Sequence, residues 1–383
     1  MIWRAAVAAG VLVLACGVGV AAAQTTASAA VPAAATPVTW SLAIHGGAGV
    51  IERSRLTPEQ DQAYRTALSE ALAVGAAVLA RGGSALDAVE ATARLMEDNP
   101  LFNAGRGAAI GADGTVTLDA AIMDGSSQKA GAVAGVMTTR HPISLARQVM
   151  ETTRHVFLIG AGADQLARER GLEQVENSWF ITPRRWLSLE QVLTADGLPL
   201  PPRPPGLDLP PRPTSSVAGA RLAADTRGAE SRFGTIGVVA RDSAGRLAVG
   251  TTTGGLTGKR WGRVGDAPVI GAGTWADRSC AVSATGTGEY FLRLTVARAI
   301  CFEAGRPGAS LQAAADTIIH RDLTGMGGDG GVIVMNAAGE AVFSLNTEGM
   351  YRGRVSSAAP AQVMIYADEA DGLIGTAAAA RPH

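Results

Sequence analysis

A single threonine, Thr235, opens the ordered part of the stretch "RFGTIGVVARDSAGRLAVGTTTGG" (residues 232–255), directly after a segment rich in proline and arginine. A threonine that becomes a chain terminus can act as nucleophile and base together, because its α-amino group, with a pKa of about 7.7 to 8 in small models, can take the Oγ proton. This chemistry requires a break between Gly234 and Thr235. Glycine tolerates unusual backbone geometry at such a bond. The stretch therefore predicts a cleavage site followed by a nucleophile.

Polar residues with complementary chemistry follow Thr235. In "TTTGG" the alternate threonines, Thr253 among them, share one face of a predicted strand and precede two glycines that let a substrate approach the backbone. "GRVGDAP" supplies Arg263 and Asp266, which are able to hold a carboxylate and an ammonium group. "SATGTGE" offers the Thr285 hydroxyl and the amides of residues 286–288 for an oxyanion hole. Taken singly, these are ordinary surface ion pairs and glycine turns; their conjunction favours a site.

Other kinds of chemistry are poorly supported. "HVFLIGAGADQLA" resembles a phosphate loop, but Gln165 stands where the third glycine belongs, so an ordinary strand-to-helix turn is favoured. The five histidines lack ligand spacing, and we interpret His45 as a structural hydrogen-bonding residue. No G-x-S-x-G elbow occurs. A net charge of −1 with scattered arginines argues against nucleic-acid binding and favours a small-molecule or dipeptide partner.

The first residues have the pattern of an export signal. Residues 1 to about 23 combine one charge at Arg4, an apolar run and a small-residue ending at Ala23. We therefore expect an exported protein, periplasmic or secreted, without stable membrane association. A retained membrane anchor is the alternative, and "VLAC", ending at Cys16, loosely resembles a lipoprotein cleavage box although Leu14 is bulky for it.

The cysteines do not form a disulfide framework. Removal of the signal leaves only Cys280 and Cys301, one in a predicted strand and one in a predicted helix. We expect two buried free thiols, although an exported compartment would permit a bridge.

Elements able to position these residues are visible from residue 37 onward. Capping signals predict helices over 57–83 and from 84, strands alternate with helices as far as residue 171, and a hairpin over 235–255 is followed by two helices and a strand pair. Clustered strands and runs of helices favour helices packed on antiparallel sheets. Between them, prolines and few apolar residues predict a disordered, cleavable linker over about 184–231.

At these motifs the chain resembles the plant-type (type 2) L-asparaginase and isoaspartyl peptidase family of N-terminal nucleophile (Ntn) hydrolases. The matching segments, in order, are "IHGGAG", "EDNPLFNAGRGA", "LDAAIMDG", "GTIGVVARDSAGRLAVGTTTGG", "GRVGDAPVIGAG", "TGTGE", "GGDGGVIVM" and "NTEGMYR". They extend from about Trp40 to Arg352 and leave out only the linker.

The resemblance implies a role for each matching residue. Thr235 would be the nucleophile released by autoproteolysis after Gly234, and Thr253 would tune it. Arg263 would bind the α-carboxylate of the aspartyl part of the substrate. The remaining implied roles are the α-amino site (Asp266 and the Gly288 carbonyl), the oxyanion hole (Thr285 and the Gly286 amide), a loop-fixing residue near the cleavage site (Asn103), and backbone carbonyl ligands of a structural sodium ion (Met96, Glu97, Asn99, Phe102, Ala104 and Arg106).

The resemblance also implies the fold, an α+β four-layer αββα sandwich of Ntn-hydrolase type. An α chain (37–234, including the linker) and a β chain (235–383) would form one domain, and two such αβ units a dimer. The implied reaction hydrolyses L-asparagine to aspartate and ammonia and cleaves isoaspartyl dipeptides, with no catalytic cofactor. N4-glycosylasparagine hydrolysis is the sister alternative, and an uncleaved, non-catalytic binding protein is the alternative of another class. Many bacterial relatives carry Asp where this chain has Gly234.

Overall fold

The first two helices begin where their capping residues predict. The computed structural model describes residues 39–212 and 234–369, so the predicted export signal lies outside the described residues. Helix α1 (Pro58–Ala80) follows Thr57, whose side chain accepts the N–H of Gln60 while the Gln60 side chain accepts the N–H of Thr57. Helix α2 (Ala85–Asp98) begins with the same reciprocal bonds between Ser84 and Asp87.

The larger sheet has eight strands. Four come from the first half of the chain, and two come from each end of the second half. Its order is β12-β11-β1-β5-β6-β2-β3-β4, antiparallel except for the parallel β3–β4 pair. The strands are β1 (Ser41–Gly49), β2 (Leu118–Asp124), β3 (Ala130–Val136), β4 (Phe157–Ile159), β5 (Ile236–Arg241), β6 (Leu247–Thr253), β11 (Gly349–Ser356) and β12 (Ala359–Tyr366).

A second sheet of four antiparallel strands, in the order β10-β9-β8-β7, packs against the first. It contains β7 (Thr274–Ala276), β8 (Cys280–Gly286), β9 (Gly330–Asn336) and β10 (Ala341–Leu345). Apolar side chains from both sheets, such as Val239, Val249 and Ile333, fill the space between them. The inner face of each sheet is thus buried against the other.

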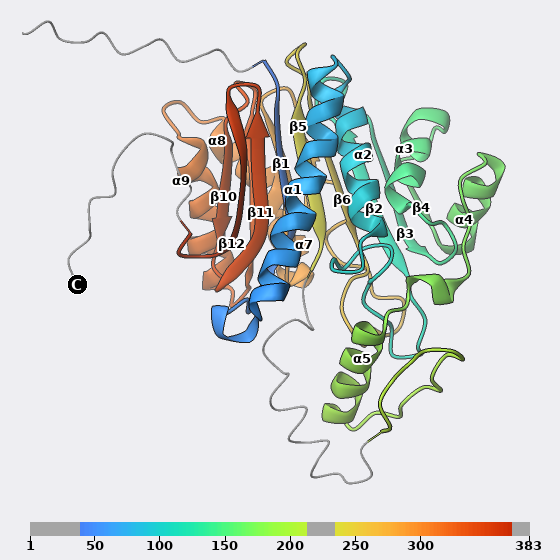
Figure 1. Ribbon diagram of the computed structural model, residues 1–383. Helices are drawn as coiled ribbons and strands as arrows, with labels where there is room; N and C mark the ends of the chain where they lie inside the picture. The colour runs from blue at the N-terminus through green and yellow to red at the C-terminus, as the bar shows by residue number, and fades with distance from the viewer. Residues whose placement is uncertain (1–38, 213–233, 370–383) are drawn as a thin grey trace, which may run out of the picture. The chain divides into compact units, whose positions relative to one another are not determined.

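Helices cover the outer face of each sheet. Helices α1, α2, α3 (Pro142–Thr152) and α4 (Gly160–Glu169) contact the larger sheet, and α1 to α3 lie side by side in Figure 1. Helices α7 (Gly288–Leu294), α8 (Val296–Ala304) and α9 (Leu311–Asp316) contact the smaller one, and α9 continues as a π-helical turn, Thr317–Leu323. Short 3-10 turns span Arg53–Arg55 and Asn177–Phe180. The expected four-layer αββα sandwich is confirmed.

The linker prediction is wrong for its first part. Residues Pro183–Ala195 form α5, which buries Trp186 and Leu189 in the main core. Glu190 of α5 accepts hydrogen bonds from Arg203 and Arg212, which follow the helix and whose guanidinium groups also bond proline carbonyls. These arginines supply the hydrogen-bond donors that the prolines lack. Residues 213–231 of the predicted linker lie outside the described residues.

Cysteine pairing also differs from the sequence prediction. Cys280 of β8 and Cys301 of α8 form a disulfide, with their Cα atoms 5.5 Å apart. The expectation of two free thiols was wrong because α8 packs directly on β8 and places both side chains at the same contact. The first of the two helices predicted after the hairpin over 235–255 is likewise interrupted, at Thr295, whose left-handed φ of 48° separates α7 from α8.

Candidate active site

Thr235 and Thr253 meet at one end of the β5–β6 pair. Thr235 immediately precedes β5, Thr253 ends β6, and the antiparallel register brings the start of one strand to the end of the other. The Thr235 hydroxyl donates to Thr253 Oγ1 at 3.1 Å, and the N–H of Gly255 donates to the same oxygen at 3.0 Å. Both threonine side chains are buried, so Thr235 Oγ1 is held in a site largely shielded from water.

Arg263 and Asp266 lie together beside this pair. A Cβ added to Gly288 would lie 2.8 Å from Asp266 Oδ1 and 2.9 Å from Arg263 Nη2, so only a glycine allows this approach. A Cβ on Gly255 would lie 3.3 Å from Arg263 Nη1, which connects the cluster to the end of β6. Arg263 donates two hydrogen bonds of 3.0 Å to the Glu289 carboxylate, so its guanidinium already presents the fork that a carboxylate needs.

The Asp266 carboxyl is buried without a full set of partners. Its Oδ2 has no hydrogen-bond partner among residues 39–212 and 234–369. Burial raises the pKa of Asp266 to about 7; the positive charge of Arg263 opposes this rise, and the negative charges of Glu289 and Asp119 add to it. A carboxylate in this position favours an incoming cation.

Thr285 and the glycine turn of β1 complete the surroundings of the predicted cleavage site. Thr285, at the end of β8, is fully buried, and its Oγ1 accepts the N–H of Ala48 at 3.4 Å. A Cβ on the neighbouring Gly47 would lie 2.5 Å from the Cα of Gly234. Thr285, followed by Gly286, thus reaches the same end of the sheets as the Gly234–Thr235 bond.

Asn103 ties the loop after α2 to the site. Its Nδ2 donates to the Gly255 carbonyl at 2.8 Å, and its Oδ1 accepts the N–H of Ala109 at 2.6 Å. A Cβ on Gly234 would lie 3.0 Å from that of Asn103. Asn103 therefore lies beside Gly234 and joins the loop after α2 to Gly255; its predicted loop-fixing role stays a prediction.

The loop predicted to bind sodium is closed by its own backbone. The carbonyls of Met96, Glu97 and Asn99 accept N–H groups from residues of the same loop at 2.7 to 3.2 Å, including that of Arg106 on Glu97. Each carbonyl has a second lone pair, so these bonds are compatible with ligation. The sodium ion stays a prediction.

Two charged residues that the sequence did not single out lie next to the end of β6. Asp119 lies opposite Thr253 in the β2–β6 register, and Lys259 Nζ donates to the carbonyls of Gly254 and Thr117 at 2.7 and 2.8 Å. Burial raises the pKa of Asp119 and lowers that of Lys259, while each charge opposes the shift of the other. Their isolated positions in "LDAAIMDG" and "TGKRWG" give no pattern that would have paired them.

Comparison with known proteins gives the site its family. A family model described as asparaginase matches residues 38–365. The chain is 44% identical to a putative isoaspartyl peptidase/L-asparaginase of Dictyostelium discoideum, covering 82% of this chain and 92% of the relative. It is 43% identical to an isoaspartyl peptidase of Salmonella typhimurium (81% and 93% covered) and 38% identical to a plant-type L-asparaginase of Pyrococcus horikoshii (81% and 94% covered). The chain therefore belongs to the plant-type asparaginase and isoaspartyl peptidase family of Ntn hydrolases.

Proposed function

We propose that this protein is an amidohydrolase that cleaves its own Gly234–Thr235 bond and then uses Thr235 to hydrolyse L-asparagine and isoaspartyl dipeptides. The observation that carries the proposal is the contact of 3.1 Å between the buried Thr235 and Thr253 hydroxyls, with Arg263 and Asp266 gathered beside them. The names of the relatives, isoaspartyl peptidase and L-asparaginase, support the same reaction.

Turnover would proceed through an ester on Thr235. Its Oγ1 attacks the side-chain carbonyl carbon of the substrate, and the new α-amino group takes the hydroxyl proton. Thr285 and the Gly286 amide would stabilise the oxyanion. Collapse breaks the C–N bond and transfers the proton to the leaving amine, which departs as ammonia or as an amino acid. Water then hydrolyses the ester and releases aspartate.

Selectivity for a side-chain amide would follow from recognition of a free amino-acid head. The Arg263 guanidinium, paired with Glu289 in this structure, would receive the substrate α-carboxylate. Asp266 and the Gly288 carbonyl would receive the α-ammonium group, which would satisfy the carboxylate that burial leaves short of partners. An ordinary internal peptide bond offers neither charged group.

N-terminal sequencing of the purified protein tests the proposal most directly. We expect a second chain beginning Thr-Ile-Gly-Val, and only full-length protein for Thr235→Ala. Rates on asparagine, β-aspartyl-leucine and a glycosylasparagine then rank the substrates. Uncleaved wild-type protein after long incubation would contradict the proposal and favour a non-catalytic binding protein, and a clear preference for glycosylasparagine would favour the sister activity.

We also propose export to an oxidising compartment. The Cys280–Cys301 disulfide supports it, because such bonds persist outside the reducing cytosol. Every helix in the described residues is too short or too polar to cross a membrane. Fractionation of cells and the mass of the mature α chain would test the proposal; a chain that retains residues 1–23 in the cytosol would contradict it.

Sodium binding is proposed for the carbonyls of the loop after α2, where the ion would fix the loop that carries Asn103. Exchange of sodium for a bulky organic cation should lower the melting temperature of the wild-type protein. An unchanged melting temperature would contradict a bound ion.

A further inference from the structure

A fully buried histidine contacts the main chain of the predicted nucleophile. His45 of β1 has no exposed surface, and both of its ring nitrogens have a polar neighbour. Nδ1 lies 3.0 Å from the carbonyl oxygen of Thr235, and Nε2 lies 2.9 Å from Ser283 Oγ on the opposite sheet. His45 thus bridges the two sheets at the residue that is to perform catalysis.

Three hydroxyl groups extend this contact through the space between the sheets. Ser283 Oγ lies 2.7 Å from Thr251 Oγ1, and Thr251 Oγ1 lies 2.7 Å from Thr274 Oγ1. All three side chains are buried, and they come from β8, β6 and β7. We call His45, Ser283, Thr251 and Thr274 the hydroxyl–histidine chain.

The Thr235 carbonyl sets the direction of the hydrogen bonds at His45 and Ser283. A carbonyl only accepts, so Nδ1 must carry the proton that bonds Thr235 O, and in the neutral ring Nε2 must then accept. Ser283 therefore donates to Nε2. Its only proton is used there, so the contact of 2.7 Å requires Thr251 to donate to Ser283, although the Gly273 carbonyl lies 3.2 Å from Thr251 Oγ1. The single proton of Thr274 is shared between Thr251 Oγ1 at 2.7 Å and the Ala267 carbonyl at 2.9 Å. The opposite tautomer would place the lone pair of Nδ1 against the lone pairs of the Thr235 carbonyl.

The contact between His45 and Ser283 requires a residue without a side chain at position 237. Gly237 lies opposite His45 in the β1–β5 register, and a Cβ added there would overlap both His45 Nε2 and Ser283 Oγ. Gly237, the second glycine of "GTIG", is therefore required for the contact between His45 and Ser283. Burial lowers the pKa of His45 to about 3, and the hydrogen bond to Thr235 opposes this effect, so the ring is neutral over the physiological range.

We propose that His45 is a positioning residue for catalysis, which holds the Thr235 carbonyl through an Nδ1–H donor, while the Ser283 hydroxyl donates to Nε2 and holds the ring in place. The inference rests on the proposed role of Thr235 as nucleophile. By holding the peptide group after Thr235, the hydroxyl–histidine chain keeps Oγ1 in register with Thr253 and with the bound substrate. The proposed substrate contacts are made by other residues. Loss of the hydroxyl–histidine chain should therefore lower kcat rather than raise KM.

The tautomer can be measured without any activity. In protein labelled with ¹⁵N at histidine, we expect the His45 ring to be protonated at Nδ1 only and to remain so from pH 8 to pH 5, the signal being assigned by its loss in His45→Asn. Thr235→Ala protein should give the same spectrum. A ring protonated at Nε2, or one that titrates like free histidine, would overturn the proposal.

Two substitutions separate the two nitrogens of His45. The amide nitrogen of Asn occupies roughly the position of Nδ1, and that of Gln roughly the position of Nε2, so His45→Asn keeps the donor to Thr235 and His45→Gln loses it. We expect kcat to fall about 10- to 100-fold in His45→Gln with KM changed less than about twofold, and to fall less in His45→Asn. Exposed His155→Gln is the matched control and should keep wild-type kcat.

The outcomes distinguish this inference from the function on which it rests. Equal kcat for His45→Gln and wild type, or equal losses in His45→Gln and His45→Asn that follow their melting temperatures, would show a structural role only and overturn the proposal. An inactive wild-type protein whose His45 is protonated at Nδ1 would contradict the proposed function while supporting the hydrogen-bond geometry.

Discussion

Burial of the Asp266 carboxyl beside Arg263 has a cost in stability. Its pKa is raised to about 7, chiefly by burial, so ionisation of this carboxyl opposes folding. A folded-state pKa above the unfolded value gives stability that is present at low pH and is lost as the pH rises through about 7. An ammonium group on the substrate would remove this penalty. In the proposed function, Asp266 would thus exchange stability of the free protein for binding of the substrate ammonium group.

We predict that Asp266→Asn raises the melting temperature at pH 8 and also raises KM. In the wild-type protein, KM should increase as the pH falls through about 7, because protonated Asp266 no longer attracts the substrate ammonium group. This dependence of KM should disappear in Asp266→Asn. Thermal unfolding and kinetics from pH 5.5 to 8.5 check both effects, and a variant less stable than wild type at pH 8 would refute the stability argument.

Arg263 should depend on the shape of its side chain as well as on its charge. We predict that Arg263→Lys raises KM about 10- to 100-fold, because a lysine replaces the two-pronged guanidinium contact by a single point charge. Exposed Arg260→Lys, three residues away, is the matched control. Measured KM for asparagine decides the prediction, and equal values for the two variants would exclude the proposed carboxylate clamp.

At the scale of elements, the sequence predicted the helix starts and the hairpin, which are determined by interactions between residues close in the chain. The capping residues Thr57 and Ser84 gave the starts of α1 and α2, and alternation gave the β5–β6 hairpin that joins Thr235 to Thr253. Pairings between distant segments have no such signal. The final strands β11 and β12 were not predicted, and the contact of His45 with Ser283 joins residues 238 positions apart.

The site shows the same division between local and distant information. Short motifs pointed to Thr235, Thr253, Arg263 and Asp266, because the types and spacing of these residues suit the proposed chemistry. Lys259 and the disulfide could not be found this way, since their roles depend on which elements pack together. The linker prediction failed at α5 because composition does not show that Glu190 binds two of the arginines.

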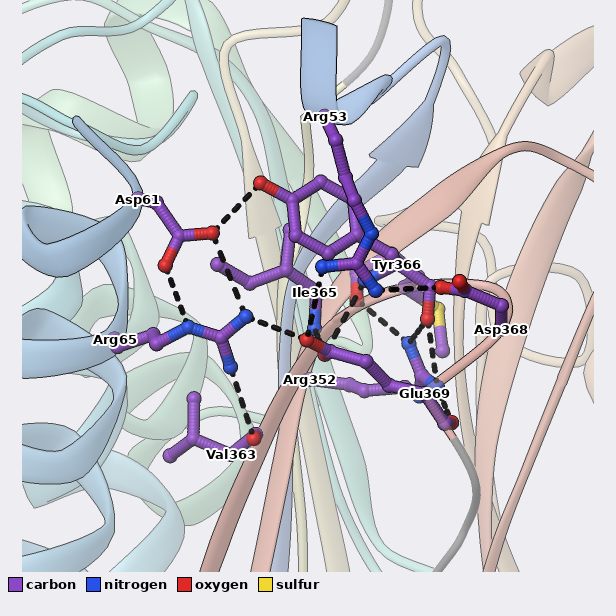
Figure 2. Close-up of polar contacts among 10 residues, drawn as sticks. Arg53, Asp61, Arg65, Arg352, Val363, Ile365, Tyr366, Asp368 and Glu369 are labelled. Carbon is purple, nitrogen blue, oxygen red and sulfur yellow. Dashed lines mark hydrogen bonds and ion pairs between the residues drawn. The ribbon is translucent and has the colours of Figure 1, made fainter. Parts of the chain in front are cut away.

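The end of β12 is fastened to α1 by a cluster of charged groups (Figure 2). Glu369 accepts a hydrogen bond from Arg65 at 2.5 Å, and Asp61 accepts bonds from Arg65 and from the Tyr366 hydroxyl, each at 2.6 Å. Arg352 donates to the carbonyls of Tyr366 and Glu369. Burial opposes ionisation of Glu369, but the bonds from Arg65 and the backbone outweigh it and lower the pKa of Glu369.

We predict that Glu369→Gln destabilises the protein modestly at pH 7, by on the order of 1 kcal/mol, because it removes the partly exposed ion pairs of Glu369 with Arg65 and Arg53. A lowered carboxyl pKa gives stability that is present above its ordinary value of 4.5 and lost as the pH falls below it. The difference between variant and wild type should therefore shrink toward pH 3. Denaturant unfolding at both pH values measures it; Glu340→Gln, an exposed residue of another hairpin, serves as the control. A difference that is constant with pH would argue against the cluster.

At the scale of the whole molecule, cleavage after Gly234 would leave two chains interleaved in one sheet. Strands β1 to β4 precede the cut, and β5, β6, β11 and β12 follow it. In the strand order β12-β11-β1-β5-β6-β2-β3-β4, β1 lies between two strands of the other chain, and β2 pairs with β6. Three strand ladders therefore join the two chains, and the main core mixes side chains from both.

We predict that the cleaved chains stay together until the fold itself is lost. Native sizing of mature protein should give one peak containing both chains, while denaturing electrophoresis gives two bands and Thr235→Ala gives one. In increasing urea, separation of the chains should coincide with loss of the far-ultraviolet dichroism, because no ladder between them can open without breaking the eight-stranded sheet. Chains that elute separately while β structure persists would contradict the interleaved topology. Coincident transitions would show that the folded state does not need the Gly234–Thr235 bond, because the ladders on both sides of β1 hold the two chains together without it.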